Sequence, residues 1–108
     1  MAGYRHKIVL LMPSGATLVD GVEVTNYVTA AEMFAAIEPL SGRELFQAQA
    51  VNPELSHRVK IRYHAGIVSS MRIRYGSRIF EIVSPPIDTG ERHRELVLMC
   101  KEMIQNGS

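Results

Sequence analysis

The sequence has little of the residue types that small proteins use for special chemistry. Among 108 residues there are one cysteine, four histidines and no tryptophan. A single cysteine excludes an internal disulfide and any motif that needs two thiols, so we expect Cys100 to be a buried structural thiol. The histidines show neither the i, i+4 helical pair nor the cysteine companions of a zinc site. We therefore expect no metal and no other cofactor.

The sequence also lacks an excess of charge and long apolar runs. Twelve Lys and Arg residues against eleven Asp and Glu residues give a formal net charge of +1, which indicates no general attraction to nucleic acid. The apolar run after Lys7 is too short for a secretory signal, and no stretch is long enough to span a membrane. We expect a protein made and used in the cytoplasm, or in a particle assembled there.

Recognisable catalytic motifs are missing as well. The sequence contains no Gly-x-Ser-x-Gly elbow, no phosphate-binding glycine loop and no cysteine with an evident histidine partner. The acidic residues are scattered singly, so spacing alone reveals no acid-base pair. We predict that the protein is not an enzyme.

Alternation of apolar and polar residues is the main structural signal. It is clearest in 58–63, followed by 71–75 and 79–83, and we expect these segments to form a three-stranded meander. Further strands are expected at 7–12, where Pro13 should end the strand, and at 95–101. Six or seven short strands predict a mainly β protein, a small antiparallel β-barrel whose closure removes exposed edges. The length fits a single domain over residues 1–108.

The segment 29–40 fits two structures equally well. Residues 29–32 match a helical capping box and the alanines favour a helix, whereas the alternation in 33–38 suits a strand buried on both faces. Before it, Asp20-Gly21 predicts a hairpin turn. The residue pattern leaves the choice between helix and strand open.

A short helix or long loop is expected in the middle of the chain, at 41–56. Ser41 and Glu44 have the spacing of a capping box, and Asn52-Pro53 should end the helix. Its apolar residues form no clean stripe, so we expect its order to depend on packing against something else. At the end of the chain, 104–108 should fray.

Four stretches, in matching order and spacing, carry a resemblance to a known family, and a fifth at the end of the chain looks like the family's last strand. The four are 5–10, 35–44, 57–63 and 75–83, and the fifth consists of 92–96 and 98–102. Together they resemble the bacteriophage head-tail joining proteins, also called head-tail adaptor, head closure or head completion proteins. The most specific piece is Glu-Pro-Leu-Ser-Gly-Arg-Glu, within the second stretch. The sequence departs from the family at Phe34, where relatives usually carry tryptophan; the aromatic character is kept.

The resemblance implies a small β-barrel with the excursion at 41–56, and it favours a strand for 29–38. It implies a structural subunit of a phage or prophage connector, arranged with copies of itself in a dodecameric ring. The ring would lie between the portal or its adaptor and the tail-completion protein, and would help to retain packaged DNA. We expect a monomer when isolated, located in the host bacterial cytoplasm before assembly and in the virion connector afterwards, without contact to a membrane.

Six basic residues and no acidic residue lie between positions 57 and 78. They are Arg58, Lys60, Arg62, Arg72, Arg74 and Arg78. Alternation puts the first three on one face of their strand, and the next two share this face if the following strand pairs with it. The resulting like-charge repulsion suggests a partner: carboxylates of a neighbouring subunit, favoured slightly, or phosphates of DNA in the channel. The alternative is an ordinary solvated strand face.

The mid-chain helix is the second candidate contact. Its residues are Ser41, Arg43, Glu44, Leu45 and Phe46. They either cap the helix and do no more, or they also dock on the next subunit.

The competing function is a small β-barrel that binds nucleic acid through its basic strand face. Such modules use an aromatic platform beside the basic residues. Here Tyr63 and Tyr75 are the aromatic residues near the arginines, and alternation places both on the inward face. This arrangement disfavours the nucleic-acid-binding hypothesis.

Overall fold

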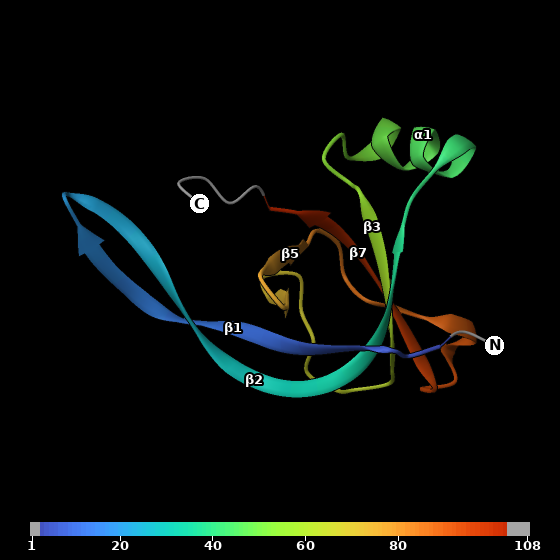
Figure 1. Cartoon of the computed structure of the whole chain (residues 1–108), viewed down its shortest axis with the longest axis horizontal. Helices are drawn as coiled ribbons and strands as arrows, with labels where there is room; N and C mark the ends of the chain where they lie inside the picture. The colour runs from blue at the N-terminus through green and yellow to red at the C-terminus, as the bar shows by residue number, and fades with distance from the viewer. Residues whose placement is uncertain (1–2, 104–108) are drawn as a thin grey trace.

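The computed structural model describes residues 3–103 and contains seven strands, one α-helix and one 3-10 turn (Figure 1). In chain order the elements are β1 (His6–Val19), β2 (Val22–Pro39), α1 (Gly42–Val51), β3 (His57–Arg62), β4 (Arg72–Tyr75), β5 (Arg78–Ile82), β6 (Ile87–Asp88), η1 (Thr89–Glu91) and β7 (Glu95–Glu102). The predicted mainly β fold with one short mid-chain helix is confirmed. The predicted fraying of 104–108 lies outside the described residues.

The strands form one antiparallel ladder that closes on itself. Their order is β3-β2-β1-β4-β5-β7, and β7 pairs in turn with β3. On its other side β7 pairs with β5 near its end and with the short β6 near its start. Because β3 and β7 pair with each other, neither remains a free edge strand of the sheet.

The core lies inside this ring of strands and receives side chains from all six strands that close it. Its most completely buried members are Ile8, Leu10, Ala35, Val59, Ile61, Ile73, Phe80, Ile82, Leu98 and Cys100. The prediction of a buried thiol is confirmed, and burial raises the pKa of Cys100 to about 12. At neutral pH the side chain is therefore a protonated thiol that serves as a small apolar group.

The hairpin of β1 and β2 is much longer than the short strands predicted. The strands have 14 and 18 residues, and the hairpin extends well beyond the ring (Figure 1). Its turn residues Asp20 and Gly21 have φ angles of 51° and 79°, as a type I′ turn requires. Pro13 does not end β1, because beyond Leu11 the strand pairs only with β2 and its register shifts between Pro13 and Ala16. Edge strands and bulges are the places where sheets accept proline.

The ambiguous segment 29–38 is a strand. Ala35 and Ala36 are buried, and Met33 and Ile37 pack against the core. Helix propensity is overruled because the segment must fill a place in the ladder between β1 and β3.

The predicted meander is correct for β4 and β5 but wrong for β3 and β4. The latter two strands are not neighbours: β3 pairs with β2 and β7, whereas β4 pairs with β1 and β5. The connection 63–71 carries the chain across the ring, so that Ile73 lies opposite Leu10 of β1. Sequence order therefore does not give spatial order here.

Helix α1 projects from the ring and has no buried residue (Figure 1). The chain leaves and re-enters the ring at one point, where the backbone N–H of Leu40 donates to the Ser56 carbonyl at 3.0 Å. Leu40 and Leu55 are buried there, at the base of the excursion. The helix stands on this base and contributes little to the core.

Alanine substitution of two phenylalanines should show that the ring of strands stabilises the protein far more than α1 does. Phe80 is fully buried, whereas Phe46 on α1 is 78% exposed. We expect Phe80→Ala to lower the free energy of unfolding by about 3–5 kcal/mol, through lost burial and a new cavity. Phe46→Ala should change it by less than about 0.5 kcal/mol. Denaturant unfolding of both variants measures this difference, and equal effects would contradict the proposed core.

Candidate assembly surfaces

The basic residues of β3 are paired with acidic residues of the same chain. Arg58 contacts Glu38 on β2, with Nη2 to Oε1 at 3.0 Å, and also bonds to Glu44 on α1. The hydrogen bond to Glu44 raises the pKa of Arg58 above its usual value. Lys60 lies 3.6 Å from the other Glu38 oxygen. These contacts tie the helix and β2 to β3.

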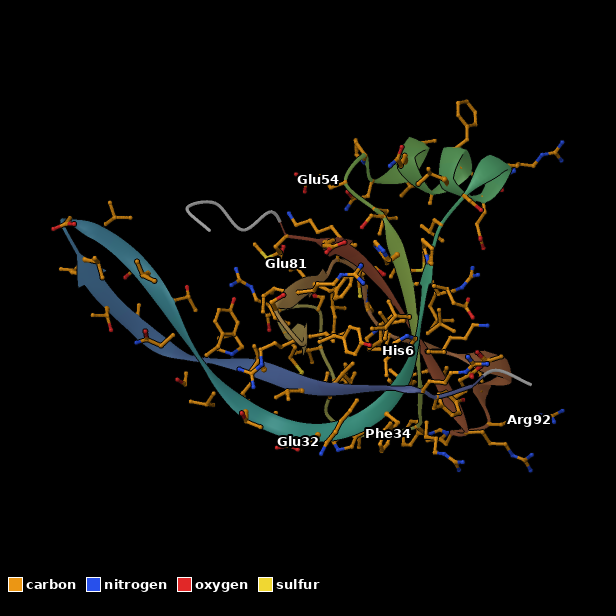
Figure 2. All side chains as sticks on the ribbon, in the orientation of Figure 1. His6, Glu32, Phe34, Glu54, Glu81 and Arg92 are labelled. Atoms are coloured by element: carbon orange, nitrogen blue, oxygen red, sulfur yellow. The ribbon has the colours of Figure 1, made fainter. Side chains whose placement is uncertain are left out.

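A second ionic chain crosses β4, β5 and β7. Arg72 lies 3.8 Å from Glu81, whose other oxygen is 3.3 Å from Lys101. Lys101 also donates to Glu54 at 2.6 Å. Glu54 and Glu81 therefore lie on the same side of the ring (Figure 2). The Arg72 guanidinium additionally lies over the Tyr27 ring at 4.4 Å. Arg72 thus anchors the base of the long hairpin as well as its neighbouring strand.

The third pair joins β5 to the end of β7. Arg78 donates to both carboxylate oxygens of Glu102 at 2.9 and 3.0 Å, a bidentate geometry that is stronger than a single contact. This hydrogen bonding lowers the pKa of Glu102. Arg78 also approaches Nε2 of His57 at 3.4 Å.

The remaining two predicted site residues have no carboxylate contact among the described residues. Arg62 is exposed and lies 5.6 Å from the centroid of the Tyr4 ring. Arg74 on β4 is also exposed. The condition for Arg72 and Arg74 to join the β3 cations on one strand pair is not met, because β3 and β4 are not adjacent.

Four of the six predicted cations are therefore neutralised within the chain. The acidic partners come from β2, α1, β5 and β7, and all but one are distant in sequence from the basic residues that they contact. Sequence spacing could not reveal them, because it depends on which strands become neighbours. The repulsion that seemed to require an outside partner is relieved internally.

The predicted helix residues lie together on the projecting element. Of the two apolar residues in this set, Phe46 is exposed and Leu45 is half-buried. Arg43 is exposed and has no ionic partner among residues 3–103. The predicted capping box is wrong in detail. Ser41 occupies the N-cap position but makes no side-chain cap hydrogen bond, and Glu44 turns to Arg58 instead.

The sequence predicted the hairpin turn at Asp20-Gly21, which is confirmed, but not the length of the hairpin or the apolar surface at its end. We define the arm as residues 12–28, the part beyond the pairing with β4; none of its residues is buried. Register places Val19 opposite Val22 and Thr17 opposite Val24, so three valines share one exposed face. A signal existed, since apolar residues flank the Asp-Gly turn directly, where a solvated hairpin tip would carry polar ones.

The two tyrosines behave differently from each other. Tyr63 was expected inside but is 37% exposed, and its ring lies 4.5 Å from that of His93. Tyr75 packs against the core as expected, with an edge-on contact to His6 at 5.0 Å. Tyr63 is exposed because β3 ends one residue earlier, at Arg62.

The described residues contain no cluster of three or more His, Cys, Asp or Glu side chains placed to hold a metal ion. Within the same part of the chain, no helix is long and apolar enough to cross a membrane.

A family model described as phage head completion protein matches residues 2–103. The chain belongs to this family. The match spans nearly the whole sequence and confirms the resemblance stated from the five stretches. Membership in the head completion family supports a structural role in the phage head, a place in the virion, contacts with other head or tail proteins and a non-enzymatic function.

A solved structure supports the fold. The solution structure of protein SF1141 from Shigella flexneri 2a is similar with a TM-score of 0.72 over 98% of each chain, at 19% sequence identity. At this identity the similarity concerns the fold alone. No curated protein matches the chain.

The half-buried His57 predicts a pH dependence of stability. Burial lowers its pKa below the usual 6.5, and this outweighs the attraction of Glu102, which Arg78 already engages. Below about pH 6.5 the unfolded chain therefore binds more protons than the folded one at this site, so the fold loses stability as the pH falls through that value. The contribution of Glu102, whose pKa is lowered, is lost only as the pH falls below about 4.5.

We expect the unfolding midpoint to fall between pH 7.5 and 5.5, and His57→Gln to make this fall shallower. Denaturant unfolding at several pH values measures the slope. Glu102→Gln, examined over the same pH interval, is the opposing control: it removes the carboxylate that raises the pKa of His57, so the fall should be at least as steep as in the wild type. An unchanged slope in His57→Gln would contradict the assignment.

Proposed function

We propose that the chain is a subunit of a phage or prophage head-tail connector. Copies form a ring, dodecameric in the virion, between the portal or its adaptor and the tail-completion protein. The observation that carries this proposal is the match to the head completion family over residues 2–103. Before assembly the protein is a monomer in the host cytoplasm.

Two projecting elements support an assembly role. The arm and α1 leave the ring of strands in different directions (Figure 1), and both are poor in contacts to their own chain. A two-stranded ribbon is at best marginally stable alone, and a helix of this length is marginal without packing. Elements of this kind gain stability when a neighbouring protein covers them.

The ion pairs within the chain make DNA a less favourable partner for the basic residues of β3, β4 and β5. Arg58, Lys60, Arg72 and Arg78 already contact carboxylates, so their potential toward DNA phosphates is reduced. In the connector, Arg62 and Arg74 remain available to a neighbouring subunit or to DNA in the channel. Retention of packaged DNA is then a steric task of the assembled ring, with at most non-specific phosphate contacts.

The joining role is tested in a phage that lacks this gene. Electron microscopy should show separate tails beside tailless heads, and the wild-type gene should restore whole virions. Heads that have lost their DNA would indicate the retention role. Normal infectious virions without the gene would contradict the proposal.

The helix can be tested in the same complementation. Phe46→Asp should reduce infectious virions strongly, because it places a charge on the most exposed apolar side chain of α1, while the unfolding midpoint stays near the wild-type value. Gln47→Asp adds the same charge at the adjacent exposed position and serves as the control. Equal titres for both variants would argue against docking through Phe46.

The nucleic-acid-binding alternative gives a different result with the purified protein. We expect no tight, salt-sensitive binding to duplex or single-stranded DNA, because most of the predicted basic face is neutralised internally. Fluorescence anisotropy at low and physiological salt measures this. Micromolar binding that weakens steeply with salt and is reduced by Arg74→Ala would favour the alternative.

A further inference from the structure

The arm of one copy fits the opposite end of a second copy in charge and in polarity. Residues 12–28 contain two acidic residues, Asp20 and Glu23, and no lysine or arginine. Both acids are exposed: Asp20 lies in the turn and Glu23 in the second residue pair behind it, and neither makes an ion pair among the described residues. The arm therefore ends in an apolar, negatively charged tip.

The tip exposes more apolar surface than a solvated hairpin needs. The face defined by Val19, Val22 and Val24 is between 43% and 62% exposed, and Leu18 on the opposite face is 73% exposed. A contiguous apolar patch with charged neighbours is typical of an interaction site. Among residues 3–103, no element outside the arm covers this patch, because the tip stands apart from the ring of strands (Figure 1).

The other end of the molecule is rich in arginine. Its four arginines are exposed and have no carboxylate contact in the described part of the chain: Arg5, Arg62, Arg92 and Arg94. Arg62 and Arg94 are neighbours, since β3 pairs Arg62 with Glu95 and the Tyr63 N–H donates to the Arg94 carbonyl. Tyr4, which precedes Arg5, lies 5.6 Å from Arg62, and Arg92 is two residues before Arg94. Figure 2 shows Arg92 at the end remote from the arm tip. Three carboxylates lie at the same end: Glu95 accepts a hydrogen bond from the neutral Tyr4 hydroxyl, Asp88 contacts His93, and Glu91 is exposed, so the arginines outnumber the carboxylates by one.

A cleft of mixed polarity lies at this end. It is open and has a volume of about 280 Å³. Tyr63, Ile67, Pro86 and Leu96 form its apolar walls, and His64, Asp88 and His93 form its polar ones. Ile87 next to it is 51% exposed. This end therefore offers a recess with apolar walls for the valines of the tip, and beside it a small excess of arginine over carboxylate for the acidic residues of the tip.

We propose that the tip of the arm in one copy docks in the cleft at the arginine-rich end of a second copy. The two surfaces lie at opposite ends of a molecule 46 Å long, so the contact is heterologous and repeats from copy to copy. Heterologous contacts produce rings when the rotation closes. The inference rests on the proposed ring and adds the surfaces that join its subunits.

The contact is weak for a single pair of free copies. The tip of a two-stranded ribbon covers less than the about 800 Å² per partner of a standard interface. In a closed ring every subunit makes two such contacts at once, and a portal or adaptor surface raises the local concentration further. A free monomer and a stable assembled ring are therefore compatible.

Disulfide trapping tests the contact with purified full-length protein. Val22→Cys marks the tip and Ile87→Cys marks the rim of the cleft, while the native Cys100 is buried and should not compete. In an equimolar mixture at high concentration under mild oxidation, the Val22→Cys/Ile87→Cys heterodimer should form several times faster than either homodimer. Val51→Cys on α1, which is 87% exposed, is the control partner and should give only the collisional rate.

Charge reversal supplies the second measurement. Asp20→Lys with Glu23→Lys should slow the tip-to-cleft disulfide, and Arg92→Glu with Arg94→Glu in the cleft partner should do the same. Combining the reversed tip with the reversed cleft should restore the rate. Absence of this rescue, a heterodimer rate equal to the Val51→Cys control, or predominance of the Val22→Cys homodimer would each overturn the proposal. Such a failure is distinct from failure of the connector role, which shows as normal virions without the gene.

Discussion

The pairing of β3 with β7 is the contact on which the rest of the structure depends. It joins the middle of the chain to its end, with Val59 opposite Leu98 and Ile61 opposite Leu96, and it closes the ladder around the core. Once the ladder is closed, the interior is filled by side chains of six strands, and nothing further can be buried there. The arm and α1 are therefore outside the core by necessity, and the surface they expose is available for contacts with other proteins.

Closure also determines the electrostatics of the outer face. Glu38, Glu81 and Glu102 come from β2, β5 and β7, and each meets a cation on a strand beside it. Most cations of the ring are consequently paired, with Arg74 on β4 as an exception. The two ends of the molecule differ in charge: the arm has acidic residues and no lysine or arginine, whereas the far end has four arginines and three carboxylates. A molecule whose two ends differ in charge favours contacts between unlike ends of successive copies.

Sequence patterns located the strands better than their arrangement. Alternation identified β3, β4, β5 and β7 because one side of each strand faces the core, so apolar and polar residues alternate along the sequence. Strand order depended on where the connection 63–71 crosses, which no local pattern encodes. The Asp20-Gly21 turn was predicted, but the length of the arm was not, because Pro13 indicates an end when a strand has two partners, whereas here it has one. The ionic partners of Arg58 and Arg78 could not be predicted either, because they lie on neighbouring strands and the strand order was unknown.

The arm exposes the conflict between stability and assembly most clearly. Unpaired edges and exposed valines are a hazard in a free protein, because they invite indiscriminate pairing with other chains. The acidic residues at the tip limit this hazard, since two tips repel each other and like ends do not associate. The same charges are attracted by the arginines at the far end. One pair of carboxylates at a hairpin turn thus disfavours the isologous contact and favours the heterologous one, which is the choice between a dimer and a ring.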